Sequence, residues 1–168
     1  MDRIKGYEAK EGEIKMLQEL ENLHLTGNIL PPQWLHHLKL PSGKPNVNAA
    51  IILSDIVYWY RPVVVRDEYN GKVLGLRKKY AKDLLQRSYN SYAEQYGFTK
   101  RQAREAIKYL ERKGLINLVF RPISVNGTIY NNVLFIELNI EKLREISEIS
   151  LIVDNKGLSI DEAYPMTL

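Results

Sequence analysis

The chain has 168 residues, of which 45% are hydrophobic and 26% are charged, values typical of one folded domain with added helices. No uncharged apolar run approaches the roughly 18 residues that a membrane span requires. The absence of cysteine excludes disulfides, cysteine nucleophiles and thiolate metal sites. Because Met1 to Tyr7 contain no apolar signal core, we expect a cytoplasmic protein with no membrane association.

The charge is distributed unevenly along the chain. Residues 72–121 contain thirteen Lys and Arg against four acids, a net charge of +9, whereas the remainder contains eleven against sixteen, a net charge of −5. A basic centre between acidic flanks is typical of a domain that meets a polyanion with one face. A solvated helical surface has the same composition, so the charge alone does not decide between these interpretations.

Helical spacing dominates the first third of the chain. Apolar residues at mixed three- and four-residue intervals predict an amphipathic helix over Glu11–Leu25, ended by Gly27. Four prolines mark residues 29–45 as a connecting segment, with a short helix expected over Gln33–Leu38. In Asn46–Tyr60 apolar residues nearly encircle the helix, which predicts the buried central helix of the fold.

A β-hairpin is predicted after Arg61-Pro62. Its strands are residues 63–66 and 72–76, and Asn70-Gly71 forms the turn. The basic segment that follows, residues 77–87, has three apolar anchors but no period that fixes its secondary structure.

Local signals are strongest between Ser88 and Gly114. A short helix is predicted over residues 89–96, interrupted by Gly97-Phe98 and followed by a long helix over residues 100–113. Thr99 and Gln102 form a capping box at its start, and Gly114 is placed to end it in a left-handed conformation. Two β-rich runs, 115–120 and 129–138, predict a second hairpin whose loop contains Asn126-Gly127. A final amphipathic helix is expected over 140–149, before a tail with little pattern.

Two helices joined by a tight glycine turn and followed by a hairpin have the order of a helix-turn-helix with a wing. Through the run SYNSYAEQYGFTKRQAREAIKYLERKGLI, residues 88–116, the chain resembles the winged-helix superfamily. The order of elements over Pro32–Leu138 resembles, more loosely, the N-terminal DNA-binding domains of phage, plasmid and primosomal replication proteins. The resemblance implies an α+β winged helix-turn-helix over 46–150, with an N-terminal helix and connecting segment over 1–45 and a tail over 151–168.

The residues of the long helix separate into two faces. At about 100° per residue, Ala106, Ile107 and Leu110 lie within about 60° of Ala103, and a charged face lies opposite. The major groove admits one α-helix, and the rigid fork of Arg donors matches guanine O6 and N7. The candidate base-reading residues are Arg101, Gln102, Arg104, Glu105 and Lys108. Lys100 and Arg112 are expected to meet phosphate, and for Glu105 an intrahelical pair with Arg101 or Tyr109 is the simpler interpretation.

Further backbone contacts are predicted outside the long helix. Arg121, with the polar loop 124–128, is the candidate in the wing. Lys78, Lys79, Lys82 and Arg87 are candidate phosphate clamps before the motif, although surface solvation explains each nearly as well.

We therefore expect sequence-specific binding of double-stranded DNA, in replication initiation of the phage or plasmid type. Transcription regulation is the alternative, and a protein-interaction scaffold without DNA binding is the alternative of another class. The N-terminal helix is expected either to form a homodimer or to pack on the body; other partners would be replication or transcription proteins.

No enzyme, metal or cofactor is expected. The three histidines, His24, His36 and His37, lack the i, i+4 spacing of a helical zinc pair. No phosphate-cradling glycine loop and no Gly-x-Ser-x-Gly elbow occurs. The eleven tyrosines and two tryptophans are interpreted as core aromatics rather than as stacking platforms for single strands.

Overall fold

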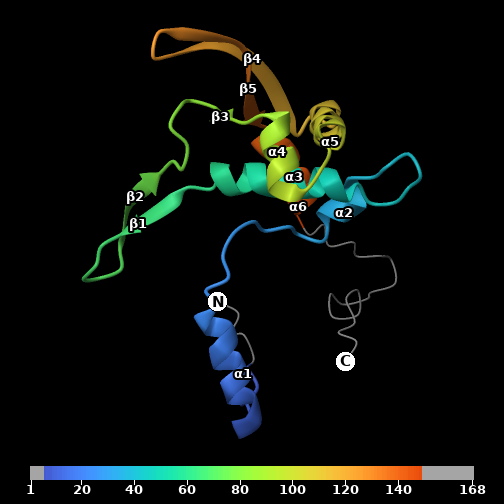
Figure 1. Ribbon diagram of the computed structural model, residues 1–168. Helices are drawn as coiled ribbons and strands as arrows, with labels where there is room; N and C mark the ends of the chain where they lie inside the picture. The colour runs from blue at the N-terminus through green and yellow to red at the C-terminus, as the bar shows by residue number, and fades with distance from the viewer. Residues whose placement is uncertain (1–5, 149–168) are drawn as a thin grey trace.

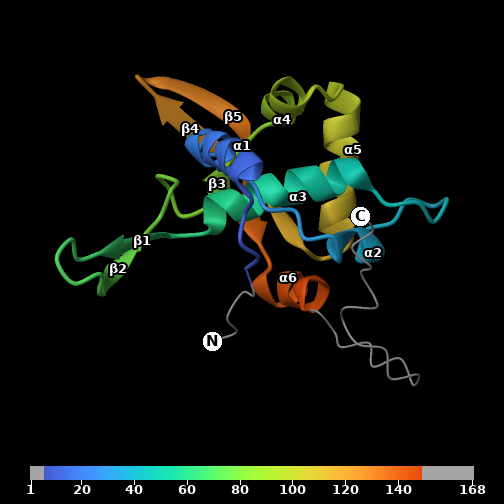
Figure 2. The same cartoon turned by 90° about the horizontal axis from the view of Figure 1, so that it is seen from below.

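The computed structural model describes residues 6–148, which form a mixed α+β fold with a two-stranded and a three-stranded antiparallel sheet. A central helix, α3 (Val47–Tyr60), runs through the middle of the body, with the other body helices around it (Figures 1 and 2). The α+β class expected from the sequence is confirmed. Within the described residues no helix is both long and apolar enough to cross a membrane.

Helix α3 is the core element that the sequence predicted. The side chain of Asn46 caps it by accepting a hydrogen bond from the backbone N–H of Ala49. Seven of the eight residues from Ala49 to Ile56 are buried, and they surround most of the helix; Ile51 and Val57 are half-buried. The burial expected from apolar residues that nearly encircle the helix is therefore confirmed.

Two helices and a tight turn follow in the predicted positions. Helix α4 (Tyr89–Tyr96) ends at Gly97, whose φ of 71° is left-handed. Helix α5 (Lys100–Arg112) begins at Thr99, where the capping box with Gln102 is formed as predicted. Short caps at both starts and a left-handed glycine between them explain why these boundaries could be predicted from local residues.

The three-stranded sheet has the order β3-β5-β4, with β3 (Leu85–Gln86), β4 (Ile116–Val125) and β5 (Thr128–Leu138). Strand β3 gives the segment 77–87 a place in the core, because Leu85 pairs with Ile136 and is buried. The predicted strand end at residue 120 and the polar loop 124–128 are wrong. Both strands continue to a two-residue turn at Asn126 and Gly127, each with positive φ, the combination typical of a type I′ turn.

The N-terminal connecting segment contributes to the same core. Helix α2 (Trp34–His37) buries Trp34, whose indole N–H donates to Ser147 Oγ at 2.8 Å. Ser147 is the last residue of α6 (Ile140–Ser147). The core therefore begins before residue 46, since Trp34 and Leu38 are both buried in it. The predicted end of this helix at residue 149 and the tail 151–168 lie outside the described residues.

Two elements project from the body. Helix α1 (Glu11–Asn22) stands below it in Figure 1, and the hairpin of β1 (Val63–Arg66) and β2 (Val73–Arg77) extends to the left. The predicted extension of the helix to Leu25 is wrong, because α1 ends at Asn22 and His24 has a left-handed φ of 46°. None of the residues of α1 is buried, so it does not pack on the body of its own chain.

Candidate nucleic-acid interface

Helix α5 presents a basic face to solvent. It packs against α3 and α4 through four buried residues, Ala103, Ala106, Ile107 and Leu110. At about 100° per residue, Arg101, Lys108 and Arg112 lie opposite this buried face, and Arg104 lies on the shoulder of the helix. Lys100, in the first turn, lies nearer the buried side. Lys108 is half-buried, and the other four cations are exposed. The two faces expected from the helical period are therefore those of the folded chain.

Two ion pairs lie along this face. Arg101 Nε donates to Glu105 Oε1 at 2.8 Å, with side chains that are 87% and 63% exposed, and Lys108 Nζ lies 3.3 Å from Glu111 Oε2. The intrahelical interpretation of Glu105 is confirmed, with Arg101 as its partner. Because these pairs are solvated, water and salt screen them and either cation can exchange partners at little cost.

Gln102 has a structural role at the start of the helix. Its side-chain oxygen accepts the backbone N–H of Thr99 at 2.9 Å. The amide is therefore held against the helix terminus, which orients it less freely toward a base than the Arg side chains. Arg104 and Arg112 share a shallow surface depression with Arg101, Glu105 and Lys108, so five of the seven predicted residues of this helix lie together. Gln102 borders another depression, and Lys100 borders neither.

Arg87 does not lie in this surface, because its guanidinium turns inward. Its Nη2 donates to Asp55 Oδ1 at 2.9 Å, and the side chains are only 17% and 2% exposed. A buried carboxylate needs such a partner, since an unpaired charge in the interior is costly. Arg87 is therefore part of the core structure, and the prediction that it clamps phosphate from the surface is corrected.

Lys78, Lys79 and Lys82 lie at the far end of α3 from α5. Lys79 Nζ donates to the carbonyl of Tyr58 at 2.9 Å and lies 3.8 Å from the centre of its ring. Asn46 and Asn48, at the start of α3, instead border the same depression as Gln102 and Glu105. At 1.5 Å per residue, the ten residues from Asn48 to Tyr58 separate these two places by about 15 Å. The basic centre of the sequence is thus two surfaces in space.

Arg121 is held by an acid near it in space but not in sequence. Its two terminal nitrogens donate to the two carboxylate oxygens of Asp83 at 2.8 and 2.9 Å. These hydrogen bonds hold the pKa of Asp83 well below its usual range, at about 2. Arg121 therefore joins the hairpin to the segment before β3, and the hairpin beyond it ends in exposed residues without charge: Val125, Ile129 and Tyr130.

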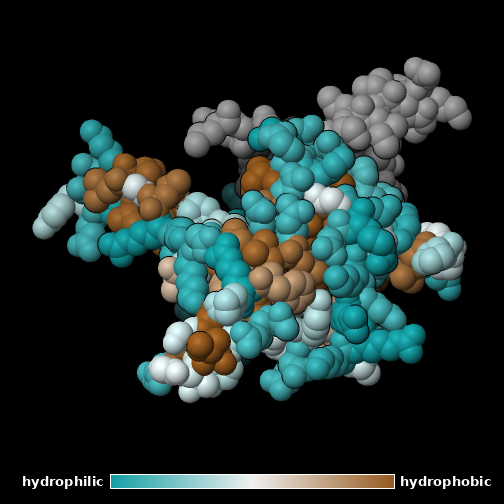
Figure 3. Space-filling view, turned by 90° about the horizontal axis from the view of Figure 1, so that it is seen from above, coloured by the Kyte–Doolittle hydropathy of each residue, from teal (hydrophilic) through white to brown (hydrophobic). Residues whose placement is uncertain are grey.

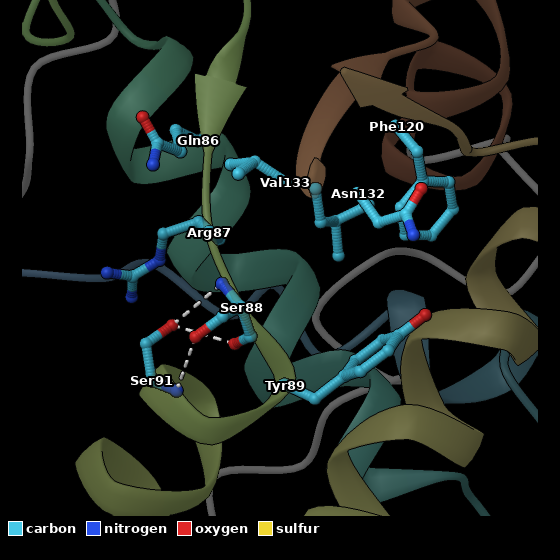
Figure 4. Close-up of a pocket in the computed structure, with 9 residues that line it drawn as sticks. Gln86, Arg87, Ser88, Tyr89, Ser91, Phe120, Asn132 and Val133 are labelled. Carbon is cyan, nitrogen blue, oxygen red and sulfur yellow. Dashed lines mark hydrogen bonds between the residues drawn. The ribbon is translucent and has the colours of Figure 1, made fainter. Parts of the chain in front are cut away.

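A larger depression of about 540 Å³ lies between the start of α4 and the β4–β5 hairpin (Figure 4). Ser88 and Ser91, which cap α4, lie on one side of it, and Phe120 and Asn132 of the hairpin lie on the other. Arg87 is the only charged residue of its lining, and it is bound to Asp55. This depression therefore offers little charge to a polyanion, and the face of α5 is the stronger candidate.

The sequence reasoning missed the group around Asp55. Tyr96 Oη donates to Asp55 Oδ2 at 2.8 Å, and Gln95 Nε2 donates to the same oxygen at 3.2 Å. One signal was available, because Asp55 is the single charged residue in an otherwise apolar helix. A carboxylate in that position needs a partner from another element.

Within the described residues no group of three or more His, Cys, Asp or Glu side chains is arranged to hold a metal ion. Comparison of the chain with protein-family models, with curated proteins and with solved structures finds no match.

Proposed function

We propose that the protein binds double-stranded DNA by placing α5 in the major groove. The observation that carries this proposal is the division of α5 into a buried apolar face and an opposite side that carries Arg101, Lys108 and Arg112, with exposed Arg104 on the shoulder. Its 13 residues span about 20 Å, and the major groove, about 12 Å wide, admits one such helix. Figure 3 supports the choice of surface, because the side on which α5 lies is largely hydrophilic.

We also propose that the fold is a winged helix. The order α3, β1–β2, β3, α4, α5, β4, β5 supports this assignment. Apart from the inserted β1–β2 hairpin, it places a helix, a short strand, a helix pair and a hairpin in succession. Strand β3 pairs with β5, so the helix pair is held against the base of the hairpin. In this arrangement β4–β5 is the wing, and its uncharged tip contributes shape and polar contacts to the backbone rather than charge.

The side chains of α5 then divide by position. Arg101 and Lys108 on the outer face, with Arg104 on the shoulder beside them, read base edges, where an Arg fork matches guanine. Lys100 and Arg112, at the two ends of the helix, neutralise phosphates. Glu105 keeps Arg101 extended along the helix until a base replaces it. Lys78, Lys79 and Lys82 are left out of this interface because of their distance from α5.

Replication initiation is the setting that we propose, and its support is the resemblance of Pro32–Leu138 to replication proteins. A transcription regulator would use the same face of α5.

Selection of bound duplexes from a random pool at physiological salt, with a single-stranded competitor, tests the proposal. It distinguishes sequence-specific duplex binding from non-specific binding and from a protein-interaction scaffold. We expect enrichment of one motif that the competitor does not remove. Retention of DNA without enrichment would contradict base reading, and no retention would favour a protein-interaction scaffold.

A further inference from the structure

Two elements of the chain leave large apolar side chains exposed to solvent. They are α1 and the β1–β2 hairpin, which both project from the body (Figure 1). In the space-filling view the hairpin carries a separate apolar patch at the left of the molecule (Figure 3). Apolar patches of this kind, rimmed by charges, mark surfaces that bind another protein.

Helix α1 has an apolar face that no part of residues 6–148 buries. Ile14, Leu17 and Leu20 recur every three residues and are 42%, 48% and 49% exposed. Met16 and Leu23, which are 54% and 63% exposed, extend the same face. A helix of 12 residues is marginal in water without tertiary contacts. Its stability therefore requires a surface that covers these side chains.

The β1–β2 hairpin also has an apolar face that is exposed to solvent. Val64 pairs with Leu76 and Arg66 pairs with Val73, so these four residues share one face of the two-stranded sheet. Val64, Val73 and Leu76 are 44%, 55% and 67% exposed. An isolated two-stranded hairpin is at best marginally stable. One face of this ribbon thus presents three large aliphatic side chains beside a cation.

The charges favour pairing these two surfaces with each other. Helix α1 contains four Glu and one Lys, a net charge of −3, so two such helices repel each other. The ribbon face carries Arg66, and the root of the hairpin carries Arg61, Arg77 and Lys78. Two ribbons in contact would therefore also oppose like charges. Of the three possible pairings, helix with helix, ribbon with ribbon and helix with ribbon, only the last buries apolar side chains and also brings opposite charges together.

The linker after α1 is fixed to the body. Asn28 Nδ2 donates to Tyr96 Oη at 2.7 Å, and Arg61 Nη2 donates to the carbonyl of Gly27 at 3.1 Å. Arg61 lies two residues before β1, so the linker of α1 is attached near the start of the hairpin. Nevertheless, α1 and the hairpin of the same chain extend in different directions (Figures 1 and 2). The geometry leaves each surface open to a second copy.

We propose that two copies form a twofold dimer in which α1 of each copy packs its apolar face on the β1–β2 ribbon of the other. Exchange of an element between identical chains is a low-cost route to a dimer, and twofold symmetry makes the contact twice. Glu13 and Glu21, which lie on the apolar side of α1, face the arginines of the ribbon, whereas Glu19 lies on the opposite side. The proposal does not depend on DNA, so its test is carried out without it.

Because the chain contains no cysteine, single cysteines report the contact directly. One variant carries Leu20→Cys in α1 and another carries Leu76→Cys in the ribbon. Both positions are exposed, so the body folds without them. After the two purified full-length variants are mixed and oxidised, we expect a disulfide-linked heterodimer as the main product, several-fold above either homodimer. Glu19→Cys, on the polar face of α1, is the matched control and should yield several-fold less heterodimer with Leu76→Cys.

Each other outcome would overturn the proposal. Homodimers of the Leu20→Cys variant would indicate pairing of two α1 helices, and homodimers of the Leu76→Cys variant would indicate pairing of two hairpins. A chain with both cysteines that closes an internal disulfide would indicate docking within one copy. Sedimentation equilibrium provides the second readout: we expect a dimer that Leu17→Glu converts to a monomer, and a monomeric parent chain would contradict the dimer.

Discussion

The carboxylate of Asp55 lies 2.9 Å from the guanidinium of Arg87, although 32 residues separate them in the chain. The same carboxylate accepts hydrogen bonds from Gln95 and Tyr96 of α4. Asp55 thus joins the central helix α3 to α4, and the turn at Gly97 joins α4 to α5. The orientation of the proposed DNA-reading helix therefore depends on a buried ion pair that itself lies outside the interface.

Removal of one partner of this pair is expected to destabilise the fold. Asp55→Ala leaves the Arg87 charge without its buried partner, a change that costs about 3–5 kcal/mol in proteins. Urea denaturation followed by circular dichroism measures the loss. Arg87→Met should cost a similar amount, and the double variant less than the two together, because no charge remains uncompensated. Strictly additive costs would show that the two side chains do not interact.

Alkaline pH is expected to loosen the same region. Burial, followed by the hydrogen bond and the charge of Asp55, raises the pKa of Tyr96 to about 12, and burial also raises the pKa of Tyr60 and of Tyr92. The folded state therefore favours the neutral phenols. Their contribution to stability is complete below the unfolded pKa of about 10 and is lost as the pH rises through the folded values.

Tyrosinate absorbance during a pH titration tests this assignment. In Asp55→Asn, the pKa of Tyr96 should fall toward 10, because the neighbouring negative charge is gone. An unchanged titration of Tyr96 in Asp55→Asn would contradict the role given to the carboxylate.

The turn between α4 and α5 requires a left-handed residue. Gly97 has a φ of 71°, and no atom lies within 4 Å of the position that a Cβ would take. The cost of Gly97→Ala is therefore conformational rather than steric, about 1–2 kcal/mol. Gly97→Asn should cost less, because Asn tolerates this conformation better. Thermal unfolding of the two variants measures the difference, and equal losses would show that something other than φ selects glycine.

Different positions on α5 should affect binding differently. Arg104→Ala is expected to weaken binding of the selected duplex roughly tenfold to a hundredfold and to relax the sequence preference at one position. Lys100→Ala should weaken all duplexes similarly and lower the slope of log affinity against log salt by about one. Fluorescence anisotropy at several salt concentrations measures both effects. The reverse assignment of these effects would show that the helix enters the groove in another orientation.

Features that depend on interactions between residues close in sequence could be predicted, whereas features that depend on distant residues could not. The turn at Gly97 and the Thr99–Gln102 capping box depend on residues within a few positions, and both are in the structure as predicted. Strand β3 escaped prediction because two residues become a strand only through pairing with β5, about fifty residues later. Pairing across the hairpin likewise extends β4 through a register shift between Arg121 and Ile123, where the pattern of residues is irregular.

The candidate site could be predicted only in part, because some of its side chains are positioned by the local helix and others by distant residues. A helical period is sufficient to place Arg101 and Arg112 on an outer face, and both are exposed in the structure. A count of charges, by contrast, does not identify partners. Arg87 and Arg121 contribute to the basic centre of the sequence, yet their acids, Asp55 and Asp83, come from elements that only the fold brings near.

The most direct test of the account compares two triple variants on the duplex recovered by selection. One variant changes Arg101, Arg104 and Lys108 of α5 to Ala, and the control changes Lys82, Lys142 and Arg144, three exposed cations outside α5 and outside the β1–β2 hairpin. Both remove three positive charges and leave the buried core intact. We predict that the α5 variant binds at least about a hundredfold more weakly, whereas the control stays within about threefold of the parent. Retained binding by the α5 variant, or an equal loss in the control, would contradict recognition of DNA by α5.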